Sequence, residues 1–173
     1  NDGNLDLMIV NGHVTDTIGM ARKDITYKQP PLLLRNRGQV RFESTGEQAG
    51  HVFVRDYAAR GLALGDFDND GATDAIFVCL NDRPVLLHNN LGNKNGWIGL
   101  ELKGISSNRD GIGAKATLRW GQRKMTRWLT GGGSFLSSHD KRLLFGLGAI
   151  TLSETVSVEI RWPNGGVQTL TGL

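Results

Sequence analysis

Four aspartates are concentrated in the stretch GDFDNDGATD, residues 65–74. Their alternate spacing lets the carboxylates turn toward one centre, and the glycine at the sixth position of the loop permits a sharp turn. Without a cation, two carboxylates about 4 Å apart repel each other by about 4 kcal/mol at an effective dielectric near 20. Oxygen donors in this number suit a hard cation, and calcium suits them best. The sequence therefore predicts a calcium loop, with the carboxylates of Asp66, Asp68, Asp70 and Asp74 and the carbonyl oxygen of Ala72 as ligands.

The same spacing begins an EF-hand, in which helices flank the loop and a bidentate glutamate stands at position 12. Here position 12 is Phe77, and the flanking segments GLALG and AIFVCL are short apolar runs typical of strands. We therefore expect a calcium loop within a β-hairpin. The alternative is a metal-free turn rich in aspartate, although a simple turn needs only one or two such residues.

The acidic stretch belongs to an internal repeat. NDGNLDLMIVNG, residues 1–12, aligns with NDGATDAIFVCL, residues 69–80, and PPLLLRNRG is similar to RPVLLHNNLG downstream. The first copy has more residues between its two phrases, and we expect this insertion, residues 13–29, to be a loop. Self-similar units of short strands are typical of propellers and solenoids.

Two later segments, residues 114–120 and 156–162, alternate between apolar and polar side chains. This period of two predicts half-buried strands. The Asn-Gly pair after the second segment predicts a hairpin. No convincing amphipathic helix is present, so we expect an all-β fold.

Composition limits the function classes. The 173 residues contain no apolar run of 18, so no membrane insertion is expected. Basic residues exceed acidic ones in residues 91–173 and not in residues 1–90, but they are scattered and lack an aromatic-stacking motif, so nucleic acid is not an expected partner. Cys79, in an apolar run, predicts a buried inert thiol. The chain begins within a turn-like phrase, and we expect a fragment whose signal peptide lies upstream.

Three longer stretches carry a family resemblance. GLALGDFDNDGATDAIFVCLNDRPVLLHNN resembles an FG-GAP/VCBS repeat, the blade unit of integrin-type β-propellers. NGWIGLELKGISSNRDGIGAKATLRW, with GGGSFLSSHDKRLLFGLG and VEIRWPNGGVQTL, resembles the ASPIC/UnbV domain. We therefore expect residues 1–92 to be blades of a truncated propeller and residues 97–173 to be a small β-sandwich-like domain, with NNLGNKNG as the linker.

The resemblance implies an extracellular or periplasmic protein with calcium in its blade loops. It also implies a role in adhesion or interaction, with no established catalytic activity. The ligands of the family carry over onto the loop of residues 66–74 as assigned above. The first repeat departs from the pattern, because it lacks the two leading aspartates. It predicts only an incomplete second site, formed by Asp2, the carbonyl oxygen of Asn4, and Asp6.

No enzyme active site is predicted. SSHD, residues 137–140, contains serine, histidine and aspartate, but consecutive residues rarely reach triad geometry and no nucleophile elbow surrounds them. We expect a polar loop there. The histidines are isolated in the sequence, with no metal-ligand spacing among them: His13, His51, His88 and His139.

Three function hypotheses follow. The leading one is a non-enzymatic extracellular scaffold that binds a protein or glycan and uses calcium as a structural ion. The second is a carbohydrate-binding module built on Trp128, which alternation places with Lys124 and Thr126 on a polar face. Nearby basic residues would join it: Arg123, Lys124 and Arg127. The third is a non-catalytic accessory region of a larger secreted enzyme.

Overall fold

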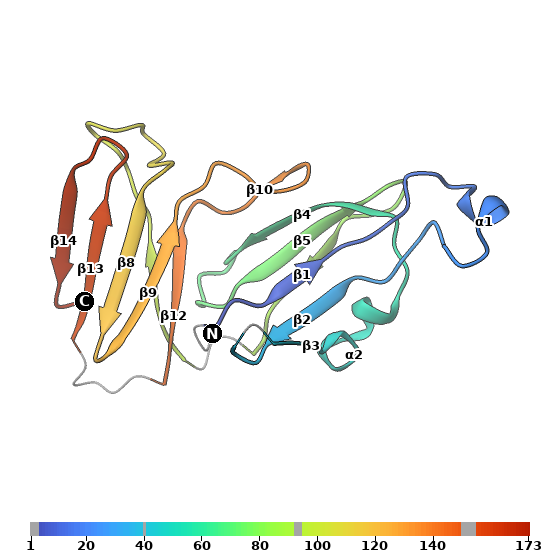
Figure 1. Cartoon of the computed structure of the whole chain (residues 1–173), viewed down its shortest axis with the longest axis horizontal. Helices are drawn as coiled ribbons and strands as arrows, with labels where there is room; N and C mark the ends of the chain where they lie inside the picture. The colour runs from blue at the N-terminus through green and yellow to red at the C-terminus, as the bar shows by residue number, and fades with distance from the viewer. Residues whose placement is uncertain (1–3, 40, 92–94, 150–154) are drawn as a thin grey trace.

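The computed structural model describes residues 4–39, 41–91, 95–149 and 155–173, and strands dominate it (Figure 1). The predicted all-β class is confirmed. The helices of the described part are single turns: α1 (Ile18–Ala21), α2 (Gly46–Ala49) and the 3-10 helix His51–Val54. None of the helices in these residues is long and apolar enough to cross a membrane.

Two three-stranded antiparallel sheets come first along the chain, in the orders β1-β2-β3 and β4-β5-β6. Their strands are β1 (Leu7–Ile9), β2 (Leu32–Asn36), β3 (Phe42–Ser44), β4 (Ala59–Gly65), β5 (Asp74–Cys79) and β6 (Val85–Leu87). Gly65 pairs with Asp74, so the acidic loop joins two antiparallel strands. As the apolar runs on either side predicted, strands flank the loop, whereas helices would flank the loop of an EF-hand.

The first hydrophobic cluster forms around Phe77, which is fully buried. Its ring meets that of Tyr57 edge-on, with centroids 5.2 Å apart. Burial of a side chain of this size contributes about 2–3 kcal/mol. Position 12 of the acidic loop is therefore a core position. Its neighbours in the cluster include Val52, Phe53, Ala59, Leu62 and Ala75.

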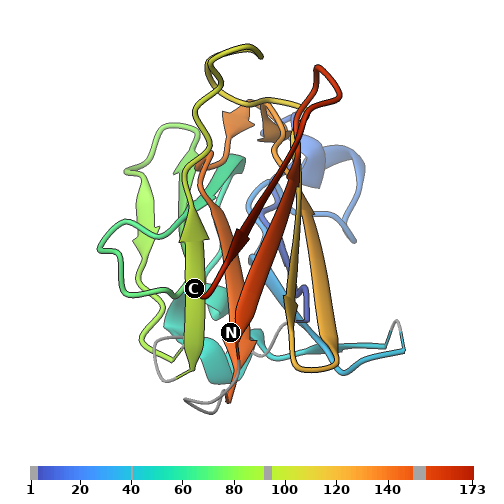
Figure 2. The same ribbon diagram turned by 90° about the vertical axis from the view of Figure 1, so that its left-hand side faces the viewer.

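The remaining strands form a four-stranded sheet, β14-β13-β8-β9, and the pairs β12-β7 and β10-β11, all antiparallel. Figure 2 views the molecule from the end where β13 and β14 lie. The strands are β7 (Gly96–Leu100), β8 (Lys115–Trp120), β9 (Arg123–Trp128), β10 (Gly133–Ser134), β11 (Ser137–Ser138), β12 (Leu143–Gly148), β13 (Val156–Arg161) and β14 (Val167–Thr171).

The second hydrophobic cluster packs between these sheets. The predicted alternation is confirmed in β13, where every second side chain is buried, and in β8 it holds except that Thr117, predicted on the polar face, is buried as well. The predicted Asn-Gly hairpin joins β13 to β14, where the Trp162 N–H donates to the Gly166 carbonyl at 2.8 Å. The fully buried centre of this cluster includes Leu118, Phe145 and Val158.

The internal repeat is visible as a repeated hydrogen-bond pattern. The N–H of Asn36 donates to Asp6 Oδ1 at 2.8 Å, and its amide donates to the Leu5 carbonyl at 3.1 Å. In the second copy, the N–H of Asn89 donates to Asp74 Oδ1 at 2.8 Å, and its amide donates to the Thr73 carbonyl at 3.2 Å. The copies differ at one edge: β5 pairs with both β4 and β6, whereas β1 pairs only with β2 among the described residues.

Two details differ from expectation. The insertion 13–29, expected to be a loop, contains the single turn α1 and is closed by the bridges Gly12–Lys28 and Gln29–Tyr57. Cys79 is only partly buried, because it ends β5 at the margin of the first cluster. Partial burial still raises the pKa of its thiol, with a smaller contribution in the same direction from Asp82.

Candidate metal centre

The acidic loop has two residues in the left-handed backbone region, Asn69 at φ 61° and Gly71 at φ 84°. Asparagine and glycine are the residues that adopt this conformation most readily. Gly71 also faces the indole of Trp97: a Cβ built on the glycine would lie 2.2 Å from Trp97 Cδ1. Glycine is therefore required here both by the backbone turn and by the contact with β7.

Backbone N–H groups hold the two ends of the loop. Asp66 accepts from the N–H of Asp70 at 3.1 Å and from that of Gly71 at 2.9 Å. Asp74 accepts from the N–H of Phe67 at 3.2 Å and, as described above, from Asn89. The exposed fractions are only 6% for Asp66 and 3% for Asp74. These carboxylates are thus fixed by the fold before any ligand binds.

The structure brings three of the four predicted carboxylates together. One oxygen from each of Asp66, Asp68 and Asp74 lies within 4.8 Å of the others. Asp70 belongs instead to a second group, with Asp68 and His88, and its Oδ1 accepts the N–H of Ala72 at 2.8 Å. Ligation by Asp70 and by the Ala72 carbonyl stays a prediction.

His88 is the residue that sequence reasoning missed. Its Nε2 lies 3.0 Å from Asp68 Oδ2, and its ring packs at a tilt against Phe67 with centroids 5.4 Å apart. The interpretation of this histidine as isolated was wrong. Because β5 and β6 pair Ala75 with Leu87, the residue after Leu87 lies beside the end of the loop. The β5–β6 register was therefore the signal that could have found it.

The donor chemistry separates the two groups. The first offers only carboxylate oxygens, the ligands that suit a hard cation such as calcium. The second adds an imidazole nitrogen, which suits zinc, copper, iron or nickel. Both share Asp68, so a cation in one group competes with a cation in the other. The oxygen-only group fits calcium, and its two buried members are preorganised.

Residues from the C-terminal part of the chain form hydrogen bonds with this loop and with β4. Arg142 donates to the carbonyl oxygen of Asp66 and to the side-chain oxygen of Asn69. On β4, the Leu64 carbonyl accepts the N–H of Asp140 at 2.8 Å, and the Leu64 N–H donates to His139 Nδ1 at 3.2 Å. We call residues 139–142 the clasp.

Electrostatics reinforce the clasp. Partial burial would raise the pKa of Asp140, but hydrogen bonds from Arg142 and its positive charge outweigh burial, and the net pKa is lowered. The same pairing raises the pKa of Arg142. His139 and Asp140 thus serve the junction with β4. The predicted polar loop at 137–140 is in part the short strand β11.

The second predicted calcium site is only partly within the described residues, since Asp2 lies outside them. Asn4 and Asp6 are exposed, and Asp6 accepts the N–H of Asn36. Within the part of the chain that the structure describes, Asp6 joins neither group of metal-ligating side chains.

The sugar-binding hypothesis needs a correction. Trp128 is 58% exposed, and the ammonium of Lys115 lies 5.0 Å from its ring centroid. Arg123 and Arg127, however, lie on the opposite face of β9, because side chains alternate along a strand. Arg127 lies over the Phe145 ring at 5.9 Å, and burial lowers its pKa. Arg123 donates to the Leu147 carbonyl at 3.3 Å.

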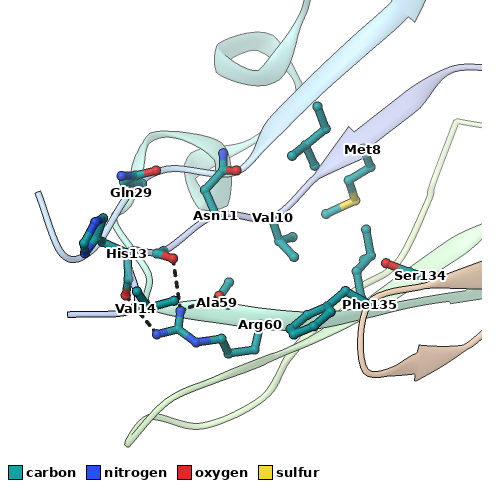
Figure 3. Close-up of a pocket in the computed structure, with 13 residues that line it drawn as sticks. Met8, Val10, Asn11, His13, Val14, Gln29, Ala59, Arg60, Ser134 and Phe135 are labelled. Carbon is teal, nitrogen blue, oxygen red and sulfur yellow. Dashed lines mark hydrogen bonds between the residues drawn. The ribbon is translucent and has the colours of Figure 1, made fainter. Parts of the chain in front are cut away.

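A cavity of about 460 Å³ lies between β1, β4 and the β10–β11 hairpin (Figure 3). Phe135, from the hairpin, lines one side, and Met8 and Val10 line another. Arg60 reaches across to carbonyl oxygens, at 2.9 Å for His13 and 3.3 Å for Gly12. Its guanidinium is therefore already engaged by the backbone, and the rest of the lining mixes apolar side chains with polar ones such as Gln29 and Ser134.

Comparison with known proteins bears on the C-terminal part. Residues 104–173 match the family described as ASPIC and UnbV. This ASPIC/UnbV segment contains strands β8 to β14 and the clasp. The predicted resemblance of the C-terminal part is therefore confirmed. No curated protein matches the chain.

Proposed function

We propose that the chain binds one calcium ion in the 66–74 loop and acts as a non-enzymatic extracellular or periplasmic scaffold. The observation that carries this proposal is the convergence of Asp66, Asp68 and Asp74 within 4.8 Å. The fixed backbone of the loop supports it, since the ligands need little rearrangement. Calcium modules outside cells work at dissociation constants of about 10⁻⁴–10⁻³ M, which such a loop can reach.

Calorimetric titration of the full, chelator-treated chain tests the proposal. Asp68 is the position to change, because it is more exposed than Asp66 and Asp74 and is not part of the core. Asp68→Ala should abolish a single calcium site, while Asp56→Ala, an exposed aspartate outside the loop, should leave it intact. Magnesium should compete poorly, because the loop offers more oxygens than its compact octahedron favours. Unchanged calcium binding in Asp68→Ala would refute the assignment.

A second candidate is a transition-metal site formed by Asp68, Asp70 and His88, favoured by the 3.0 Å contact of His88 Nε2 with Asp68. The variant His88→Gln distinguishes the calcium site from the transition-metal site, because only the second uses the imidazole nitrogen. Calcium binding that persists in His88→Gln, with loss of any zinc binding, assigns calcium to the oxygen-only group. Loss of both would mean that His88 is needed for the calcium site.

We further propose that residues 1–92 are FG-GAP/VCBS-type blades of a β-propeller and that residues 97–173 form a separate β-sandwich-like domain. The repeated pattern of Asp6 with Asn36 and of Asp74 with Asn89 supports the blades. Two distinct hydrophobic clusters support the division. The blade assignment requires a further strand beside β1, and an experimental structure of the protein tests whether one is present.

The scaffold would bind a protein or a glycan. The exposed indole of Trp128 favours the glycan, because an aromatic face stacks on the apolar face of a sugar ring. The third hypothesis, an accessory region of a larger secreted enzyme, stays a prediction that the full-length gene sequence tests. A glycan array with Trp128→Ala as the control variant separates sugar binding from protein binding.

A further inference from the structure

The outward face of the four-stranded sheet carries basic side chains at two levels. At one level, Arg161 lies opposite Lys115, and Lys115 lies opposite Trp128. At the other, Arg119 lies opposite Lys124. Four residues of strand separate the two levels, which corresponds to about 13 Å. We call these four basic residues and Trp128 the basic face.

The basic face contains unfavourable contacts that the fold does not require. Like charges directly opposite on neighbouring strands destabilise a sheet. None of the four basic residues forms an ion pair within the described part of the chain. Among the residues that the structure describes, the partner of the Lys115 ammonium is the indole of Trp128. An anionic ligand would remove the repulsion at both levels.

The level between the two basic ones has a different character. From β14 to β9 it reads Thr169, Glu159, Thr117 and Thr126. The hydroxyls of Thr117 and Thr126 are 3.2 Å apart. An ionised glutamate only accepts hydrogen bonds, so a ligand here must bring donors to the middle and negative charge to the ends.

We propose that the basic face binds an acidic polysaccharide, a hydroxyl-bearing chain with carboxylate or sulfate groups. Sugar hydroxyls would donate to Glu159, the anionic groups would meet the two basic levels, and one ring would stack on Trp128. A nucleic acid fits less well, because its continuous phosphates would set negative charge against Glu159. The inference rests on the sugar-binding role proposed for Trp128 and is independent of the calcium proposal.

The test uses the full chain and three immobilised probes: heparin, polygalacturonate and neutral dextran. We expect binding to at least one acidic probe and not to dextran, with affinity that falls as salt rises. Chelator should have no effect. Arg119→Glu should weaken binding at least tenfold, and Trp128→Ala should weaken it as well. The matched control is Lys23→Glu, the same charge change at an exposed site far from the sheet in sequence, expected to alter binding less than twofold.

Each other outcome contradicts the inference in a distinguishable way. Equal binding to dextran would keep sugar binding and reject the acidic class. No binding to any of the three probes would reject both the sugar-binding role of Trp128 and the acidic class of ligand. An equal loss of probe binding in Lys23→Glu would mean that net charge, and not the basic face, determines the binding. Displacement of the probe by a low concentration of a DNA oligomer would make nucleic acid the partner. A thermal melt of Arg119→Glu verifies folding, and we expect no loss of stability because the variant removes a like-charge pair.

Discussion

Arg142 donates a hydrogen bond from its guanidinium to the backbone carbonyl oxygen of Asp66, 76 residues earlier in the chain. The second branch of the guanidinium reaches the side chain of Asn69. A residue of the ASPIC/UnbV segment thus holds the acidic loop through the Asp66 carbonyl and the Asn69 side chain, and not through the carboxylates of the candidate metal centre. The loop conformation depends on the C-terminal part as well as on its own hairpin.

Arg142→Leu should therefore destabilise the junction. Charge-assisted hydrogen bonds stabilise proteins by about 1.5–3 kcal/mol, and solvent at this partly exposed site reduces that to about 1 kcal/mol. Urea unfolding measures the change, and limited proteolysis should show earlier cleavage near residues 64–72. Arg22→Leu, which breaks the exposed ion pair with Asp24, is the control and should change the stability much less than Arg142→Leu, because solvent screens this pair. Equal effects of both variants would mean that the clasp adds nothing beyond a surface ion pair.

Gly71→Ala should be destabilising for two separable reasons. A left-handed backbone costs a residue with a Cβ about 1–2 kcal/mol, and the new methyl would overlap the Trp97 ring. Both contributions, the backbone cost and the overlap with the ring, are measured by thermal melts of Gly71→Ala, Trp97→Ala and the double variant. The double variant should be more stable than the sum of the single changes predicts, because Trp97→Ala relieves the overlap and leaves the backbone cost. Simple additivity would show that the ring moves aside freely.

Asp140 should make stability depend on pH in the acidic range. Its pKa is lowered in the folded chain, so the folded state binds fewer protons than the unfolded state as both titrate. The stabilisation is complete above the unfolded-state pKa, near pH 4, and is lost as pH falls through the folded pKa. Asp140→Asn should thus be less stable than the parent chain at pH 7, with a gap that narrows toward pH 3. Urea unfolding across this range measures it, with Asp56→Asn as the control; a gap independent of pH would exclude the ion pair as its cause.

The two halves of the chain, each built on one hydrophobic cluster, should differ in their ability to fold alone. Residues 97–173 alone should melt cooperatively and be insensitive to chelator, because their cluster is closed around buried Leu118, Phe145 and Val158. Residues 1–92 alone should aggregate or remain loosely structured, with calcium helping only in part, because Ile76 and Val78 leave apolar surface on β5. Separate thermal melts with and without chelator decide this. A sharp, calcium-independent transition for residues 1–92 would contradict the blade proposal.

Local patterns predicted much of the fold. Alternation along residues 114–120 and 156–162 predicted which faces of β8 and β13 are buried, because period two is a property of each strand alone. The Asn-Gly pair predicted the hairpin between β13 and β14, and the apolar runs beside the acidic loop predicted its flanking strands. Each of these features depends on residues close together in the sequence.

Features that depend on register or on distant contacts could not be predicted in the same way. His88 meets Asp68 only because β6 pairs with β5 in one register. Arg142 reaches Asp66 through packing between distant segments, for which the sequence has no local pattern. The grouping of Arg123 and Arg127 with Trp128 was avoidable from the sequence. Side chains alternate along β9, so the odd-numbered Arg123 and Arg127 lie on the face opposite the even-numbered Trp128.

The open edge of β1 has a consequence for handling the chain in solution. Its backbone donors and acceptors on that side have no strand partner among the described residues, and Leu7 and Ile9 are exposed beside them. A strand edge of this kind templates the addition of another strand, and proteins usually protect such edges with charge, proline or a covering segment. β1 has none of these within Leu7–Ile9. We therefore expect this edge to promote self-association of the chain at high concentration, and Leu7→Lys should reduce it.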